Sequence, residues 1–306
     1  MDVAMKHSEE HKEVNDENAN SGETVDARTI PAGSINLLSF VRRFFPKEDL
    51  PCTLPTAVDS LIYNMDHPKR GTCVIFNNKS FDHSTGLNER RGTDEDAAQL
   101  YCLFREMDFE VRVHQDFSWR DIISTLEKLG KEDHSQNDCF VCCMLSHGDN
   151  DILYGKDGKF ATESIFAPFR GDVCKSLVGK PKLFFIQACR GDRLDDGVTV
   201  LDTTDAVSRV YKVPSQADFL TCYSTVAGYY SWRNTIQGSW FIQAVCKVIK
   251  EHAARMDLLS MMTIVCQRVA YHFESCVPQD RKMDRRKQVP TIVSTLTRQV
   301  YFKSKF

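Results

Sequence analysis

The stretch that decides the fold is Lys182–Asp192, KLFFIQACRGD, in which a run of bulky apolar residues stops at a thiol followed by Arg-Gly. Such a run is typical of a central strand in a parallel sheet, because these strands are buried on both faces. Cys189 then stands just beyond the carboxyl end of that strand, where open α/β sheets place their chemistry. Because a cysteine at a strand end is more often core packing, Cys189 is either a small hydrophobe or a nucleophile.

Apolar or alternating runs recur along the chain, separated by stretches with helical spacing. Thr93 can begin one helix, with its hydroxyl as the cap and Asp96 three residues on, and Ser118 can begin another. This alternation predicts a three-layer α/β fold, in which helices cover both faces of a mostly parallel sheet. Further strands are expected at 72–76, 109–114, 139–145, 217–223 and 291–302, and two further helices at about 240–248 and 258–269.

Composition and charge narrow the class of protein. The chain has 306 residues, 42% apolar and 26% charged, as in ordinary globular proteins. Its formal net charge of −3 argues against dedicated nucleic-acid binding. We find no run of about 18 apolar residues and no pattern of a secretory signal. The 12 cysteines are therefore expected to be free thiols in a reducing compartment, the cytoplasm.

We expect no metal or cofactor. Cys139 and Cys142 have the C-x-x-C spacing, but they lie in an apolar strand whose residues face alternately, and no second pair lies at zinc spacing. The sequence also lacks the GxxxxGK[ST] pattern of a phosphate-binding loop.

The amino-terminal part differs from the rest. Residues 1–26 hold eight acidic and two basic side chains and no aromatic residue, as disordered segments do. In the extension that follows, 27–62, residues 35–47 have the spacing of a short amphipathic helix. That helix either docks on the domain or contacts a membrane surface or a partner. Farther on, the polar stretch at about 193–216 predicts a loop that is functional or is cut.

A second predicted strand is also followed by a reactive side chain. The strand at 139–145 runs into Ser146-His147-Gly148. If the two strands are neighbours, His147 and Cys189 emerge at one edge, where an imidazole can take the proton of a thiol nucleophile. The N–H groups of Gly148 and Cys189 could then stabilise an oxyanion.

The local sequence decides between the two interpretations of Cys189. Residues 187–191, QACRG, match the caspase signature, and His147 stands 42 residues upstream. The longer motifs ERRGTDEDA, LSHGD, ADFLTCYSTVAGYYSWRNTIQGSW and KQVPTIVSTLT agree with it. The chain from about Tyr63 to Phe302 thus resembles a caspase, and the short segment before the domain resembles executioner members of that family.

The resemblance implies a six-stranded sheet flanked by helices and a cysteine endopeptidase of apoptosis that cleaves proteins after aspartate, with a preference for the pattern Asp-x-x-Asp. It implies a zymogen with a large subunit, 63–205, and a small subunit, 206–306, that works as a dimer of large-plus-small units. An upstream initiator caspase would be its activator. An inhibitor-of-apoptosis protein is a further candidate partner, through a new terminus at Ala206.

The same resemblance implies a role for individual residues. Cys189 would be the nucleophile and His147 the acid/base, with Gly148 at the oxyanion. Two guanidiniums and an amide would hold the substrate carboxylate, since fork-shaped charged donors suit it. These are Arg90, Gln187 and Arg233, while the adjacent Arg91 is expected at the surface, and the other substrate-binding residues would be Tyr230, Ser231, Trp232, Asn234 and Trp240.

Three aspartates are candidate cleavage sites. Asp205 ends the stretch DTTD within the polar loop, and cleavage there would separate the subunits. Asp26 ends ETVD and Asp59 ends TAVD, and either could release the propeptide. We favour Asp26, because its surroundings have the composition of a disordered segment.

The chain departs from executioner caspases at one place. After FES, where those relatives continue with aromatic residues, this sequence has Cys276 and an Arg/Lys-rich run at 281–287. The preference for aspartate at the fourth substrate position is therefore open. The basic run is either a solvated loop or part of the substrate site.

Two other functions fit the same fold. The chain could be a catalytically inactive caspase-like protein that regulates by binding, but Cys189, His147 and the three pocket residues are all present. It could also be a related peptidase that cuts after basic residues, but that pocket would carry carboxylates in place of Arg90 and Arg233.

Overall fold

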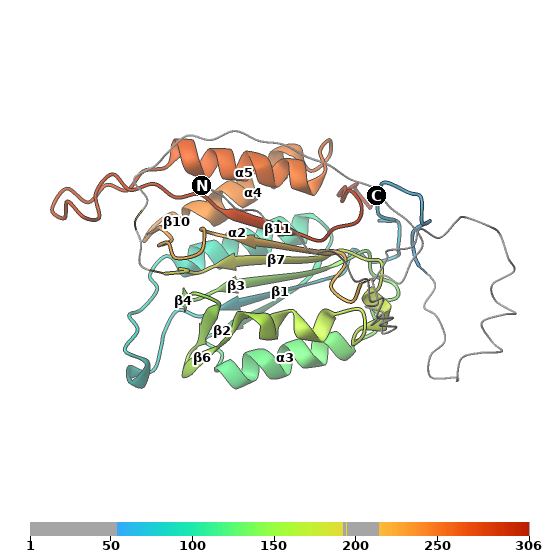
Figure 1. Cartoon of the computed structure of the whole chain (residues 1–306), viewed down its shortest axis with the longest axis horizontal. Helices are drawn as coiled ribbons and strands as arrows, with labels where there is room; N and C mark the ends of the chain where they lie inside the picture. The colour runs from blue at the N-terminus through green and yellow to red at the C-terminus, as the bar shows by residue number, and fades with distance from the viewer. Residues whose placement is uncertain (1–53, 192–193, 195–213, 306) are drawn as a thin grey trace, which may run out of the picture. The chain divides into compact units, whose positions relative to one another are not determined.

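The computed structural model describes residues 54–191, 194 and 214–305, and its centre is a six-stranded sheet (Figure 1). Neighbouring strands follow the order β11-β8-β7-β3-β1-β2, and all pair in parallel except β11, which runs antiparallel to β8. The predicted three-layer α/β fold is thereby confirmed. The strands are β1 (Thr72–Asn77), β2 (Glu110–Gln115), β3 (Phe140–Leu145), β7 (Lys182–Gln187), β8 (Phe219–Tyr223) and β11 (Thr291–Ser294).

Helices cover both faces of the sheet, with α4 and α5 on one side and α3 on the other in Figure 1. No helix within the described ranges is long and apolar enough to cross a membrane. The α-helices are α2 (Thr93–Glu106), α3 (Trp119–Lys131), α4 (Trp240–His252) and α5 (Leu258–His272), and the short elements are η2 (His83–Thr85), β4 (Gly148–Asp149), β5 (Ile152–Gly155), β6 (Gly158–Ala161), η3 (Thr162–Ile165), η4 (Ala167–Phe169), η5 (Lys175–Leu177), β9 (Arg233–Asn234) and β10 (Gly238–Ser239).

The apolar runs of the central strands serve two cores at once. In β1, Cys73 and Ile75 pack with α2, α4 and α5, whereas Val74 and Phe76 pack with α3. Because successive side chains of a strand face opposite ways, a strand covered on both sides must be apolar throughout. The edge strand β2 is covered less, and each of its residues is half-buried or exposed.

Helix starts depend on side-chain caps, and one of them differs from the prediction. Ser118 caps α3 as expected, since its hydroxyl accepts the N–H of Asp121. The predicted cap at Thr93 was wrong, because Gly92 precedes α2 and the Thr93 hydroxyl instead donates to Asn77 Oδ1 at 2.7 Å. Asp96 is likewise not part of a cap, because it is buried against Ser239.

The last strand is shorter than predicted. It was expected at 291–302, but β11 ends at Ser294. Val300 and Phe302 are nevertheless buried. The apolar residues after Ser294 are therefore buried by packing against α5 and not by pairing in the sheet. The N–H of Leu258, the first residue of α5, donates to the carbonyl of Val300.

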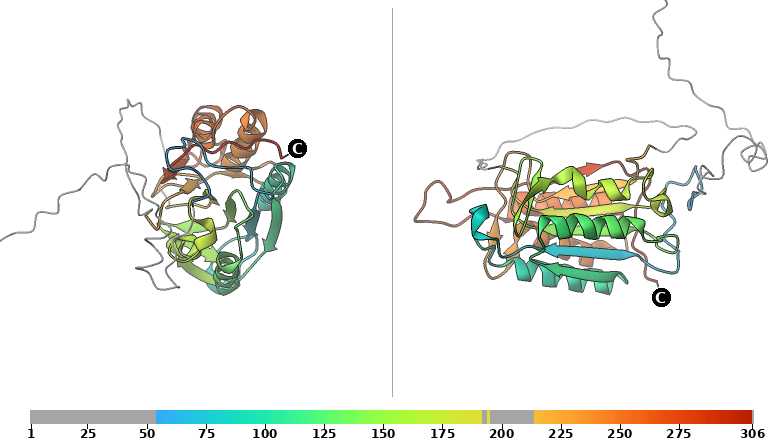
Figure 2. Two further views of the ribbon diagram at one scale, coloured as in Figure 1. Left: turned by 90° about the vertical axis from the view of Figure 1, so that its right-hand side faces the viewer. Right: turned by 90° about the horizontal axis from the view of Figure 1, so that it is seen from below.

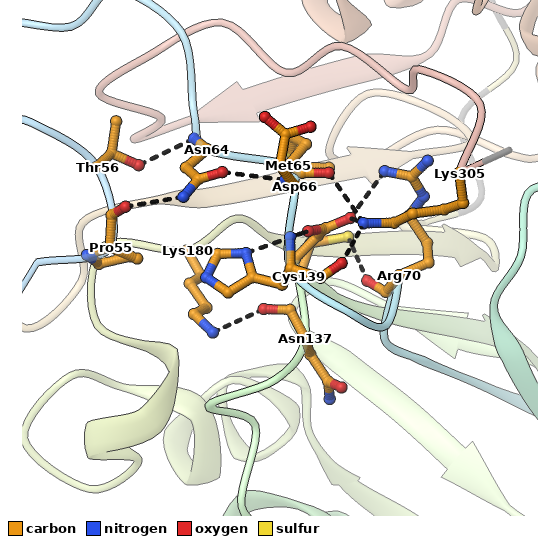
Figure 3. A network of polar contacts seen from close by, with 12 residues as sticks. Pro55, Thr56, Asn64, Met65, Asp66, Arg70, Asn137, Cys139, Lys180 and Lys305 are labelled. Carbon is orange, nitrogen blue, oxygen red and sulfur yellow. Dashed lines mark hydrogen bonds and ion pairs between the residues drawn. The ribbon is translucent and has the colours of Figure 1, made fainter.

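A buried ionic network (Figure 3) involves residues just before the amino ends of β1 and β3. Asp138 is fully buried and pairs with Arg70 at 2.8 Å and with Lys305 at 2.5 Å. Its Oδ1 also accepts the backbone N–H of His67 at 2.8 Å. Lys305 in turn donates to the carbonyl of Met65 at 3.0 Å. This network therefore ties the carboxyl-terminal segment to the segment that leads into β1.

Replacing Asp138 by alanine is expected to destabilise the protein strongly. Arg70 is only 2% exposed, so its guanidinium would be left buried without its carboxylate. Breaking a buried pair in this way costs about 3–5 kcal/mol, which for a domain of this size lowers Tm by roughly 10 °C. Thermal unfolding followed by circular dichroism measures the change. Glu110→Gln, which breaks an exposed pair with Arg112, is the control and should shift Tm by no more than about 2 °C.

Candidate active site

The register between β3 and β7 brings His147 and Cys189 to one edge of the sheet. Leu145 pairs with Gln187, and the N–H of Ser146 donates to the carbonyl of Gln187 at 3.1 Å. His147 and Cys189 each lie two residues beyond that last pair. This is the juxtaposition predicted from the two strand ends.

Gly148 allows the two chain segments to approach closely beyond the strands. A Cβ placed on Gly148 would lie 2.7 Å from the carbonyl oxygen of Cys189 and 2.9 Å from the Cβ of Ala188. Any side chain here would force the segments apart. The glycine therefore keeps the backbone after His147 against the backbone that carries the thiol.

Cys189 carries a half-buried thiol and lies just beyond the carboxyl end of β7. Its Sγ lies 3.9 Å from the carbonyl oxygen of Ser231. Burial raises the pKa of Cys189, while the positive charges of Arg90 and Arg233 oppose that rise. Both guanidiniums therefore lie near enough to act on the thiol through their charge. The thiol form is therefore favoured at neutral pH.

His147 is held in one orientation by a backbone carbonyl. Its Nε2 lies 2.9 Å from the carbonyl oxygen of Asn88, and its ring packs on Phe81 with 4.9 Å between centroids. Donation from Nε2 leaves Nδ1 as the acceptor of a neutral imidazole. Burial and the charges of Arg90 and Arg233 lower the pKa of His147 to about 4. The imidazole is therefore neutral and able to accept a proton at physiological pH.

The pH dependence of alkylation of Cys189 in the unliganded enzyme should show whether the thiol and the imidazole are both neutral. Because the pKa of Cys189 is raised and that of His147 is lowered, thiol and imidazole stay neutral between about pH 5 and 8. The rate of reaction of Cys189 with iodoacetamide should then rise about tenfold per pH unit in that range, since only the thiolate reacts. Peptide mapping by mass spectrometry measures this rate. A rate that levels off below pH 7 would show a preformed thiolate–imidazolium pair and contradict the prediction.

Arg90 is a fully buried guanidinium with unused donors. Its Nη1 donates to the carbonyl of Asn78 at 3.0 Å and to the hydroxyl of Thr93 at 2.7 Å. Nε and Nη2 have no hydrogen-bond partner within the described residues, although both are buried. Burial and the charge of Arg233 lower the pKa of Arg90 to about 9. A buried cation with free donors is the feature expected of a pocket for an anion.

Arg233 is the second predicted arginine, and it lies on β9, where its charge acts on Arg90. Its Nε donates to the carbonyl of Arg91 at 2.9 Å, and burial lowers its pKa. Gly92 makes this contact possible, because it has a φ of 84° and a Cβ there would lie 2.4 Å from the carbonyl oxygen of Asn234. The side chain of Arg91 is 77% exposed, as expected. This contact thus brings the segment that carries Arg90 against the segment that carries Arg233.

Gln187 and Ser231, both predicted to bind substrate, contact each other. Both are buried, and Nε2 of Gln187 donates to the hydroxyl of Ser231 at 2.9 Å. Oε1 of Gln187 has no partner within the described residues. Turning the amide by 180° would let Oε1 accept from Ser231 and point Nε2 at a carboxylate, and the two orientations differ only in the hydrogen-bond network. The amide can therefore serve as the third donor.

The predicted outer pocket residues belong to a ladder of aromatic rings. Tyr230, Trp232, Trp240 and Phe273 follow one another with 5.1, 5.7 and 5.5 Å between ring centroids. Tyr230 is 37% exposed, whereas Trp232 and Trp240 are almost buried. Asn234 uses its Oδ1 to accept the N–H of Ile236, which leaves its amide N–H₂ at the surface. Phe273 was not predicted as part of this ladder.

Asp96 is a further site residue that we did not predict. It is fully buried, and its Oδ1 accepts the N–H of Ser239 at 2.7 Å. Its charge acts on both Arg90 and Arg233, and burial raises the pKa of Asp96 to about 6. Asp96 therefore offsets part of the repulsion between the two guanidiniums. An aspartate in the first turn of a helix usually indicates a cap or dipole effect, so no pattern in the sequence indicated this contact.

The three candidate cleavage sites differ in what the structure describes. Asp26 and Asp205 lie outside the described residues, as do most of the polar loop at 193–216 and the segment at 35–47. Asp59 is exposed in a turn, where the N–H of Ser60 donates to the carbonyl of Ala57 at 3.1 Å.

Comparison with known proteins agrees with this geometry. Residues 70–301 match the family model of the caspase domain. Caspase-7 of Gallus gallus is 42% identical over 296 residues, covering 93% of this chain and 95% of that protein. Caspase-3 of Mus musculus is 46% identical over 240 residues, covering 78% and 86%. The crystal structure of caspase-1 from Spodoptera frugiperda covers 84% of this chain and 98% of its own, with a TM-score of 0.78 and 41% identity. With this fold and this site, the chain belongs to the caspase family and is a cysteine endopeptidase of apoptosis that cleaves proteins after aspartate.

Proposed function

We propose that this caspase cuts its substrates with Cys189 as the nucleophile and His147 as the acid/base, and that Arg90, Gln187 and Arg233 hold the substrate aspartate. The observation that carries the proposal is the buried guanidinium of Arg90, whose Nε and Nη2 have no partner among the described residues while its charge acts on Cys189. A substrate carboxylate would satisfy both donors beside the reacting sulfur.

The neutral pair sets the order of proton transfers. Sγ of Cys189 attacks the backbone carbonyl carbon of the substrate aspartate as its proton passes to His147, and the carbonyl oxygen becomes an oxyanion. The N–H groups of Gly148 and Cys189 stabilise that oxyanion. His147 then gives the proton to the leaving amine, the C–N bond breaks and a thioester remains. Water, deprotonated by His147, attacks the thioester and releases the new carboxylate and the thiol.

The outer contacts support a preference for small or branched apolar side chains near the cut. Tyr230 and Trp232 offer the edges of a T-shaped pair as a wall for the second substrate side chain. Ser231 supplies the carbonyl next to Cys189. The exposed amide of Asn234 can donate to an acidic fourth residue, and Trp240 supports the wall from behind.

Maturation would follow the same specificity. We propose cleavage after Asp205 to give the large subunit, 63–205, and the small subunit, 206–306, and removal of the propeptide after Asp26 or Asp59. An initiator caspase is the proposed activator, the cytoplasm the proposed location, and a dimer of large-plus-small units the working form. An inhibitor-of-apoptosis protein could bind the terminus at Ala206. Intact-mass analysis should find chains that begin at Ala206 and at Ala27 or Ser60, and other termini would contradict these sites.

A pair of peptides tests the function. Asp-Glu-Val-Asp and Asp-Glu-Val-Arg, each followed by the same fluorogenic amine, are compared by kcat/KM. The proposal expects turnover of the aspartate peptide alone. Turnover of the arginine peptide would indicate a peptidase of basic specificity, and turnover of neither would favour an inactive regulator. An aspartyl aldehyde that blocks Cys189 provides the active-site titration.

A further inference from the structure

The loop between α5 and β11, which we call the basic loop and define as residues 274–287, projects from the end of the sheet that carries the site. Figure 1 shows it beyond β10, on the same side as β4, and the right-hand view of Figure 2 shows the same projection. It carries five basic and three acidic residues. From the sequence alone, its basic run had two possible interpretations, a solvated loop or a part of the substrate site.

The backbone of the basic loop is fixed by its own hydrogen bonds. Ser275 is buried at its base, where its N–H donates to the carbonyl of Arg286 at 3.0 Å and its hydroxyl to the carbonyl of Met283 at 2.5 Å. The N–H of Arg285 returns to the carbonyl of Ser275 at 2.8 Å. These bonds hold the two arms of the loop together, so its side chains project from a defined frame.

The two acids inside the loop point to its own backbone. Asp280 accepts the N–H of Lys282 at 2.9 Å, and Asp284 accepts the N–H of Val277 at 2.8 Å. Neither forms an ion pair with a residue that the structure describes. The acids therefore stabilise the turn and do not neutralise the cations beside them. Glu274 is exposed at the base of the loop.

Three cations remain directed to solvent. Arg281, Lys282 and Arg285 are exposed, and within residues 54–191 and 214–305 their charged groups have no hydrogen-bond or ion-pair partner. The other two are used inside the structure, since Arg286 donates to the carbonyl of Lys282 at 2.6 Å and Lys287 to the carbonyl of Phe273 at 2.6 Å. A fixed frame with three free positive charges suits an acidic partner.

Both ends of the loop are attached to the aromatic ladder of the substrate site. At one end Phe273 stacks on Trp240. At the other, Oε1 of Gln288 accepts the N–H of Trp232 at 2.7 Å, next to Arg233. Placed end to end, the three centroid separations of 5.1, 5.7 and 5.5 Å reach at most about 16 Å, the length of four to five extended residues at ~3.3 Å each. The basic loop, which carries the three cations, begins directly after Phe273 at this end of the ladder.

We infer that the basic loop binds acidic side chains at the fifth and more distant positions before the cleaved bond, through Arg281, Lys282 and Arg285. This inference rests on the proposed function, since it extends the same substrate path. It selects substrates in which a run of Glu or Asp precedes the cleavage motif. A single-stranded nucleic acid is the less favoured ligand, because the basic loop has no aromatic residue for base stacking and the whole chain is acidic.

Three extended peptides test the inference. Each has the core Asp-Glu-Val-Asp before the fluorogenic amine and is preceded by three glutamates, three alanines or three lysines. At low salt the glutamate peptide should have a kcat/KM roughly three- to tenfold above the alanine peptide, as several exposed ion pairs allow, and the lysine peptide should fall below it. The advantage should shrink in 0.5 M NaCl because of screening.

Two triple variants show where the effect comes from. Arg281→Gln with Lys282→Gln and Arg285→Gln should make the glutamate and alanine peptides equal while leaving the alanine peptide unchanged. Lys128→Gln with Lys131→Gln and Lys159→Gln makes the same change of net charge on the exposed α3 side and should keep the advantage.

Other outcomes overturn the inference. Equal cleavage of the three peptides by the unaltered enzyme rejects it and leaves the proposed function standing, whereas no cleavage of any of them rejects both. An advantage that survives the loop variant, or disappears in the control variant, assigns the effect to the general field of the protein. Binding of a labelled single-stranded oligonucleotide that depends on the three cations, without a glutamate advantage, assigns the loop to nucleic acid.

Discussion

Replacement of Cys189 by alanine is expected to reduce kcat/KM for the Asp-Glu-Val-Asp peptide by at least about 10⁴-fold, to the background rate. The reason is that the covalent route is lost, and neither the pocket nor the oxyanion donors can supply another nucleophile. The residue is only half-buried and alanine is smaller, so the fold should be retained. Purified enzyme, titrated by mass and assayed over hours, gives the measurement.

Binding separates this loss from misfolding. The Cys189→Ala variant should still bind a peptide that ends in aspartate, because Arg90, Arg233 and Gln187 are unchanged. Titration calorimetry should show a Kd within about threefold of that of the unaltered enzyme. Substantial hydrolysis by the variant would show that another residue is the nucleophile, and loss of binding together with hydrolysis would show a structural role for the thiol.

Replacement of Arg90 by methionine is expected to lower kcat/KM for aspartate peptides by about 10³-fold. Methionine fills the buried space, but the substrate carboxylate loses two charge-assisted donors in a site that excludes water, and each is worth about 1.5–3 kcal/mol. The loss should appear mainly in binding of the carboxylate. For a peptide with asparagine in place of aspartate, kcat/KM should fall much less from the unaltered enzyme to the Arg90→Met variant, because the neutral amide depends less on the cation.

The neighbouring arginine is the matched control. Arg91→Met removes the same kind of side chain one residue away, from a position that is 77% exposed. Its carbonyl, which accepts from Arg233, is retained. We expect kcat/KM within about twofold of the unaltered enzyme, since exposed ion pairs contribute little. Equal losses in the two variants would show that the segment 90–92 acts only by its backbone and that Arg90 does not bind the carboxylate.

The sequence was sufficient for the sheet and the reactive pair. Apolar strands that end in His147 and Cys189 are local signals, and parallel pairing of neighbouring strands follows from the alternation of strand and helix. The pocket is different, because Arg90 and Arg233 lie in loops, where an arginine is usually solvated. Only the resemblance to caspases separated Arg90 from Arg91.

What the sequence could not predict depends on contacts between distant segments. Asp96 meets Ser239 across 143 positions, so its role appears only when α2 and α4 are packed together. The Thr93 hydroxyl likewise turns to Asn77 because the start of α2 is buried against β1. Phe273 joins the aromatic ladder through packing with Trp240. In each case a local pattern competed with a tertiary contact, and the contact prevailed.

The position of the proposed activating cleavage between two paired strands determines how the two products are held together. Asp205 lies between β7 and β8, which are adjacent strands paired from Lys182 with Phe219 to Ile186 with Tyr223. Cleavage there would give two polypeptides, one with β7 and one with β8. They would stay associated through the backbone hydrogen bonds between these strands and through the shared hydrophobic core, without a covalent bond between them. The mature protein should therefore migrate as two bands only after denaturation, and proteolysis would free two new chain ends while the framework that carries the thiol and the imidazole stays whole.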